Sequence, residues 1–274
     1  MQFLHQSATQ TRNAQADQQG FTLVEMAVVL VIIGLILGAV SIGKDLQRDA
    51  EYDKIKQKYV DQWAQAYNGY YQRAGVVLGD DQTQPRIMVN GATYVAGSGA
   101  PTSGGDMTGV TPPGAICHLS AGPSMARGFT AGTDPDLHGL MDRIGVRMPP
   151  GRAEGQEDRY VYLDSNGNPQ ELQVCFQWNT PATASGSGNV MVITGLTPDL
   201  ARALDQMIDG KPDAREGVFR QEGVGNGTPG GPGSEWSANN TYQFGASGAT
   251  GTGSGQNQDE DQIITLVANF KMNQ

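Results

Sequence analysis

The residue types that most often carry catalysis or bind metal are sparse in this chain of 274 residues. The histidines and cysteines are His5, His118, His138, Cys117 and Cys175. They form no C-x-x-C or H-E-x-x-H array, the spacings that bring metal ligands to one site. Ser124 lacks the G-x-S-x-G context of a nucleophile, and no G-x-x-x-x-G-K-[ST] loop is present to hold phosphates. We therefore predict structural or surface histidines, no metal, no cofactor and no enzymatic activity.

One segment has the outline of a calcium loop. Asp164-x-Asn166-x-Asn168 matches its first ligand positions, but Pro169 stands at position six, where Gly is required. Cys175 stands at position twelve instead of a bidentate Glu. We interpret this segment as a turn.

Glu25 is the ionisable residue in the most unusual surroundings. From Phe21 to Val40 the sequence reads FTLVEMAVVLVIIGLILGAV, in which only Thr22 and Glu25 are polar. A carboxylate at the centre of a membrane helix costs about 2.5–3.5 kcal/mol, so it requires a partner or a place near the headgroups. A headgroup position near the helix start, favoured by the helix dipole, is the simpler alternative to a functional role.

The apolar run itself spans a bilayer. Twenty helical residues rise about 30 Å, the thickness of the hydrocarbon core. An ordinary secretory signal has a shorter apolar region and a positively charged start, whereas Met1 to Gly20 contains one base, Arg12, and one acid, Asp17. Ala39-Val40-Ser41 would still pass as a cleavage site, and a buried core helix is the remaining alternative.

The residues Gly20-Phe21-Thr22-Leu23-Val24-Glu25-Met26 and the apolar run resemble the class III signal sequence of type IV pilins and type II secretion pseudopilins. The resemblance implies that a prepilin peptidase/N-methyltransferase cuts after Gly20 and methylates Phe21. It further implies that Glu25 pairs with the α-amine of Phe21 on a neighbouring subunit. The 20-residue leader and the absence of Lys or Arg just before Gly20 depart from the common pattern, so the subclass stays open.

An amphipathic helix is predicted to follow the apolar run. One helical face is formed by apolar residues spaced three or four apart: Tyr52, Ile55, Tyr59, Trp63, Ala66 and Tyr70. The whole helix is expected over 21–73, with 21–40 as the transmembrane and filament-core part. A free-standing stalk is possible for its second half, but the aromatic content favours packing on a sheet.

The remainder, 74–274, is predicted to be a globular head. Asn90-Gly91 within 86–95 predicts one hairpin, and 160–163 with 172–178 predict a second. In the second hairpin, alternation puts Leu172, Val174, Phe176 and Trp178 on one face. Further strands are expected at 189–194 and 263–270.

A short helix is expected to follow Thr197, because Thr197-Pro198-Asp199 is a strong start signal and Gly210 a stop signal. Its apolar stripe is Leu200, Ala203, Leu204 and Met207. Asp205, Asp209 and Asp213 lie near its end. Because some pseudopilins bind calcium through acids in their C-terminal region, a cation site is one interpretation; solvated acids are the favoured one.

Cys117 and Cys175 would lie in an oxidising compartment after translocation. A disulfide between them would close a loop of about 59 residues and stabilise the fold by roughly 4 kcal/mol in the entropy model. Two buried thiols are the alternative.

Composition narrows the function further. The net charge of −10 and the lack of a basic run argue against a nucleic-acid partner. The chain contains 38 glycines, more than is usual, and much of this excess lies in 97–114 and 221–257. Both stretches are predicted to be long surface loops or disordered linkers.

The predicted fold is therefore α+β: a cleaved leader (1–20), a long helix on an antiparallel sheet, and a loop-rich head. We expect a structural subunit of a type IV pilus-like filament, with a length that suggests a minor or large pilin. A type II secretion pseudopilin and a membrane-anchored binding protein with a prepilin leader are the alternatives. The implied partners are other subunits, membrane lipid and an inner-membrane assembly platform. The implied location is the inner membrane, then a periplasmic or extracellular filament.

Overall fold

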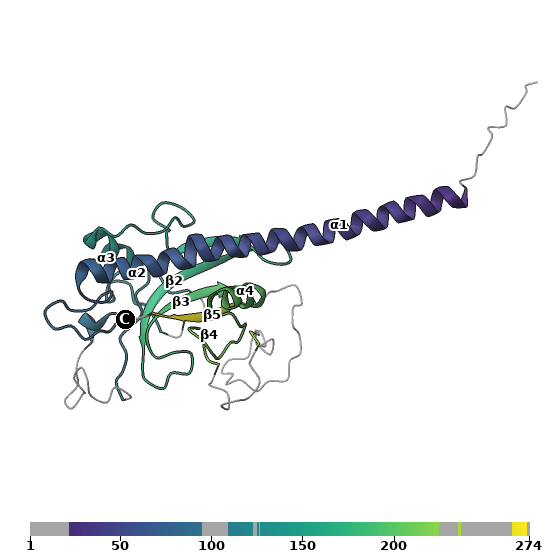
Figure 1. The fold of residues 1–274 in the computed structure, drawn as a ribbon. Helices are drawn as coiled ribbons and strands as arrows, with labels where there is room; N and C mark the ends of the chain where they lie inside the picture. Colours follow the sequence, from purple (N-terminus) through teal and green to yellow (C-terminus); the bar gives the residue numbers. More distant parts are fainter. Residues whose placement is uncertain are drawn as a thin grey trace, which may run out of the picture. The chain divides into compact units, whose positions relative to one another are not determined.

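The computed structural model describes residues 22–94, 109–122, 125, 127–224, 235–236 and 265–272. The chain divides into two compact units, Met1–Gln47 and Arg48–Gln274. Helix α1 covers Leu23–Ile55, so its last turns belong to the second unit. The first unit consists, in its described part, of the apolar portion of this helix (Figure 1).

The second unit continues the helix without a break. A π-helical segment, Lys56–Val60, leads into α2, Asp61–Ala74. Helix α2 ends at Gly75, whose left-handed φ of 76° is readily adopted only without a Cβ, and whose N–H bonds the carbonyl of Tyr71. The predicted end of the helix at residue 73 is thus confirmed to within a residue.

Five antiparallel strands form the sheet. They are β1 (Arg159–Leu163), β2 (Pro169–Asn179), β3 (Gly188–Leu196), β4 (Phe219–Gln221) and β5 (Leu266–Lys271). Their order is β1-β2-β3-β5-β4, with β2 and β3 paired from Gln173↔Thr194 to Asn179↔Gly188. The predicted strands at 160–163, 172–178, 189–194 and 263–270 are confirmed within the described residues.

The predicted apolar face of the helix packs against this sheet and is shielded from solvent (Figure 1). Tyr59 meets Tyr160 of β1 with ring centroids 5.3 Å apart, and Trp63 meets Phe176 of β2 at 6.2 Å. All six residues of the predicted stripe are buried. Burial of such aromatic side chains supplies the largest part of the apolar stabilisation. The stalk alternative is therefore wrong, and the chain has the predicted α+β fold.

The described part of the second unit contains two further α-helices. α4, Pro198–Asp209, is capped by Thr197, whose hydroxyl accepts the N–H of Leu200, and it contacts β4 and β5. α3, Leu137–Ile144, contacts α2 and was not predicted, although Asp136 and Gly145 carry its start and stop signals. The stripe residues Leu200 and Leu204 of α4 are fully buried.

The hairpin predicted at Asn90-Gly91 is wrong. Residues 86–94 contain no strand; Asn90 is in the left-handed region and precedes a 3₁₀ turn, Gly91–Thr93. The carboxylate of Asp80 accepts the N–H groups of Arg86 and Ile87 at 2.9 and 2.7 Å, which folds this segment into a loop around it. The hydrogen bonds to the buried carboxylate of Asp80 therefore stabilise a loop here in place of the hairpin that the Asn-Gly pair favours locally.

The turn predicted at Asp164 is confirmed. Its Oδ1 accepts the N–H groups of Asn166 and Asn168, and its Oδ2 accepts the amide of Gln170 at 3.0 Å. The side chain thereby closes the β1–β2 connection as an Asx turn does.

Candidate functional site

The structure describes the chain from Thr22, one residue after Phe21, which is the predicted first residue of the cleaved protein. Gly20 and Phe21 lie outside the described residues, so the structure gives no account of the scissile bond. Thr22 and Glu25 are described, and they form the first turn of α1.

The side chains of Thr22 and Glu25 each accept a hydrogen bond from the other residue's backbone N–H. Glu25 Oε2 accepts the N–H of Thr22 at 2.8 Å and its hydroxyl at 2.9 Å. In return, the N–H of Glu25 donates to Thr22 Oγ1 at 3.2 Å. This reciprocal pattern is a capping box, with Thr22 as N-cap and Glu25 three residues later. The sequence reasoning missed it, although the Thr-x-x-Glu signal before an apolar run is visible at 22–25.

The capping box fixes where the carboxylate lies. Both bonds from Thr22 go to Oε2, at the exposed N-terminal end of the helix. A negative charge is stabilised there by the helix dipole. Glu25 is therefore held at the start of the apolar helix.

The rest of the first unit is exposed, and up to Val40 its surface is apolar. Residues 22–47 are all exposed, including Leu23 at 90 % and Leu35 at 70 %. This helix is long and apolar enough to cross a membrane, and its most apolar 18-residue window contains no buried residue. Such a surface requires lipid or other helices to cover it.

Comparison with known proteins gives the same result for this segment. Residues 15–41 match the family model described as the prokaryotic N-terminal methylation motif. The chain carries a prepilin-like class III signal sequence. Type IV pilins and type II secretion pseudopilins carry such prepilin signals, and a membrane-anchored precursor fits the apolar helix. No curated protein and no solved structure matches the chain.

The head is cross-linked as predicted. Cys117 and Cys175 form a disulfide with an S–S distance of 2.07 Å. Both are fully buried on the sheet face opposite Phe176, in a small cluster that includes Ala115, Met125 and Phe129. The bond attaches the segment before α3 to β2.

The three acids near the end of α4 are not the solvated group that the sequence favoured. Asp205 and Asp213 are buried, with 0 % and 2 % exposed. Asp205 Oδ2 accepts the indole N–H of Trp236 at 2.7 Å and the N–H of Asp213 at 2.6 Å, while Asp209 accepts the N–H groups of Val218 and Phe219. They organise the chain between α4 and β4, because backbone donors there have no strand partner.

Trp236 lies inside the stretch 221–257 that the sequence assigned to a surface loop. Its side chain is fully buried and packs on Phe219 with centroids 5.2 Å apart. The surface assignment is therefore wrong at Trp236. Most of 221–257, and 97–108 of the other predicted loop, lie outside the described residues.

We expect the stability of the fold to depend on pH, because the pKa of Asp205 is raised. Burial, aided by the charge of Asp209, raises the pKa of Asp205 to about 7, against the opposing bonds from Trp236 and Asp213. The folded chain then binds this proton more tightly than the unfolded chain, whose Asp pKa is about 3.9. The contribution of Asp205 to the free energy of unfolding is therefore fully present below pH ~4. It is lost as the pH rises through 7, by at most about 1.4 kcal/mol per pH unit.

Asp205→Asn should remove this slope. We expect urea unfolding, followed by tryptophan fluorescence at pH 6 and pH 8, to show a smaller loss of stability with pH in Asp205→Asn than in the parent. Equal losses in the two proteins would contradict the assignment. Asp142→Asn, an exposed acid on α3, is the control and should behave like the parent.

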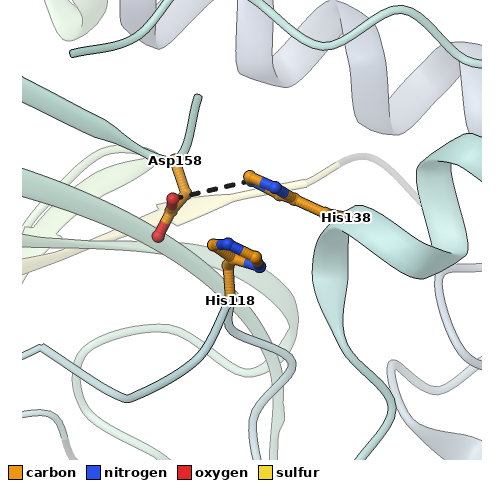
Figure 2. Close-up of side chains that lie close together, drawn as sticks. All are labelled: His118, His138 and Asp158. Atoms are coloured by element: carbon orange, nitrogen blue, oxygen red, sulfur yellow. Dashed lines mark ion pairs between the residues drawn. The ribbon is translucent and has the colours of Figure 1, made fainter. Parts of the chain in front are cut away.

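The two histidines of the head are not isolated. The imidazole rings of His118 and His138 stack with centroids 3.6 Å apart and planes 8° apart, and Asp158 lies beside them (Figure 2). The sequence spacing gave no sign of this, because three separate segments bring the residues together. His5 and Ser124 lie outside the described residues.

Proposed function

We propose that the chain is a structural, non-enzymatic subunit of a type IV pilus-like filament. The observation that carries the proposal is Glu25, hydrogen-bonded at the start of an exposed apolar helix within a prepilin signal. In the proposed pathway a prepilin peptidase/N-methyltransferase cuts after Gly20 and methylates Phe21. The apolar helix first anchors the subunit in inner-membrane lipid and then enters the filament core.

In the proposed filament, assembly gives Glu25 a cationic partner in addition to its bonds from Thr22. Moving the apolar helix among other helices transfers this carboxylate to a low-dielectric environment, where an unpaired charge is costly. The α-amine of Phe21 on a neighbouring subunit would neutralise it. The pairing therefore favours a subunit position in which Phe21 of one chain lies level with Glu25 of the next.

The size of the mature chain favours a minor or large pilin. Removal of the leader leaves 254 of the 274 residues, most of them in the second unit. A large head restricts how densely copies pack around a filament, which suits a subunit present in few copies or near the tip. The proposed route takes it from the inner membrane, through an assembly platform, to a periplasmic or extracellular filament.

A type II secretion pseudopilin is the second candidate, because the methylation motif is common to both assemblies. The neighbouring genes separate them: a retraction ATPase favours a pilus, and a secretin with secretion pseudopilins favours the second candidate. A membrane-anchored binding protein is a third, in which Glu25 would have no assembly role.

The direct test is recovery of the chain from sheared surface filaments. We expect mass spectrometry of this fraction to detect peptides of the head, together with an N-methylated peptide that begins at Phe21. Deletion of the prepilin peptidase gene should remove both from the fraction. Absence of the chain from filaments that contain other pilins would contradict the proposal.

A further inference from the structure

Two imidazoles and a buried carboxylate converge in the head at a place unrelated to the apolar helix. His118 follows the disulfide-bonded Cys117, His138 lies in the first turn of α3, and Asp158 directly precedes β1. One nitrogen or oxygen atom from each lies within 4.8 Å of the others (Figure 2). We propose that His118, His138 and Asp158 form a binding site for a divalent transition-metal ion of the zinc type.

The carboxylate of Asp158 gives the first argument. Its side chain is fully buried, and Oδ1 has no hydrogen-bond partner. Oδ2 accepts the amide of Gln173 at 3.2 Å, and Arg159 Nε is 3.9 Å away. A buried, half-satisfied carboxylate is costly unless a cation compensates it.

The distance from Asp158 to His138 gives the second argument. Asp158 Oδ1 lies 3.5 Å from His138 Nε2, and neither atom has a hydrogen-bond partner. Two ligands of a tetrahedral zinc ion lie about 3.4 Å apart, given bonds of 2.0–2.2 Å. The spacing is thus long for a shared proton and right for a shared ion.

The outer nitrogens of both rings give the third argument. His118 Nδ1 lies 3.0 Å from a carboxylate oxygen of Asp136, and His138 Nδ1 lies 3.5 Å from Glu157 Oε2. Metal-binding histidines usually donate this second N–H to a carboxylate, which fixes the tautomer and leaves Nε2 for the metal. The His118 ring has that arrangement, whereas Glu157 Oε2 lies near His138 Nδ1 without a hydrogen bond.

The surroundings of His118 Nε2 give the fourth argument. With the N–H on Nδ1, a neutral ring presents a lone pair at Nε2, and this atom lies 3.1 Å from the carbonyl oxygen of Gly155. Two acceptors at that distance repel each other. A metal ion beside both atoms would remove the repulsion.

Coordination requires one ring to turn. The rings are parallel and stacked, whereas their lone pairs must converge on one ion. His118 is held by Asp136 at Nδ1, but His138 has only contacts of 3.5 Å, so its ring is the one that turns about χ2. The backbone that carries the ligands stays in place: the carboxylate of Asp136 caps α3 by accepting the N–H of His138 at 2.8 Å.

Zinc binding to the full chain, purified in detergent without a polyhistidine tag, tests the site. We expect calorimetry at pH 7.5 to show one zinc ion per chain, with Ca²⁺ unable to compete, because imidazole nitrogens suit zinc and calcium requires oxygen ligands. Co²⁺ should give the visible absorption of a site with nitrogen ligands. Asp158→Asn and His138→Ala should each weaken zinc binding at least tenfold.

Controls separate a ligand role from a structural one. Asp142→Asn, an exposed acid on the same helix as His138, should bind zinc like the parent. Asp158→Asn should melt no lower than the parent without metal, since it removes a buried charge, but it should lose the rise in melting temperature that zinc gives the parent. No saturable zinc binding, or equal binding by Asp158→Asn, would overturn the proposal.

Discussion

Glu25→Gln is expected to exclude the chain from surface filaments while leaving it processed and folded. Gln accepts the same bonds from Thr22, so the capping box and the start of α1 are retained. Only the negative charge that would pair with the α-amine of Phe21 is lost. Removing one side of a buried ion pair costs about 3–5 kcal/mol, which corresponds to a loss of subunit affinity of roughly 100-fold or more.

The measurement is the ratio of this chain in sheared filaments to the chain in the membrane fraction, by quantitative mass spectrometry. Glu51→Gln is the matched control, because Glu51 lies on the same helix beyond the apolar run and should be incorporated like the parent. Glu25→Ala adds loss of the cap and should be no better than Glu25→Gln. Unchanged incorporation of Glu25→Gln would limit Glu25 to its capping role.

Gly20→Ala is expected to leave the leader attached in essentially every copy. Without cleavage, Phe21 has an amide nitrogen instead of a charged α-amine, so Glu25 has no cationic partner on a neighbouring chain. Intact-mass measurement should therefore find the precursor mass with no N-methyl group, and the filament fraction should contain none of the chain. Gln19→Ala, one residue earlier, is the control and should be processed normally.

The two variants separate processing from assembly. Both should be absent from filaments, but only Gly20→Ala should retain residues 1–20. A Gly20→Ala chain of mature mass would place the cleavage elsewhere. Mature Gly20→Ala in normal filaments would contradict the assignment of Gly20 altogether.

Periodic burial is what the sequence predicted best. The stripe from Tyr52 to Tyr70 and the alternation from Leu172 to Trp178 each depend on a single repeat in one element. Tyr67 was missed, although it is buried and stacks on Phe176 at 5.2 Å. Tyr67 lies four residues after Trp63 and three before Tyr70, so it belongs to the same helical face.

Polar residues with distant partners were predicted worst. Asp205 was expected in solvent, yet it is bonded to Trp236, 31 residues away in the sequence. The Asn90-Gly91 turn gave way to a loop built around Asp80. In each case the deciding partner is supplied by the tertiary fold, and local propensity contains no information about it.

The candidate site divides in the same way. The apolar helix, Glu25 and the disulfide were readable from one-dimensional patterns, and the family match confirms the signal sequence. The group formed by His118, His138 and Asp158 was not, because 20 residues separate each from the next. Only the packing of α3 beside β1 and the cross-linked segment brings them together.

The disulfide has a topological consequence for that group. Along the backbone, His118 and Asp158 are 40 residues apart, but through the Cys117–Cys175 bond the path is about half as long. Halving the length of a loop lowers the entropic free-energy cost of closing it by about 0.6 kcal/mol. The cross-link therefore lowers the entropic cost of bringing His118 and Asp158 together in one site.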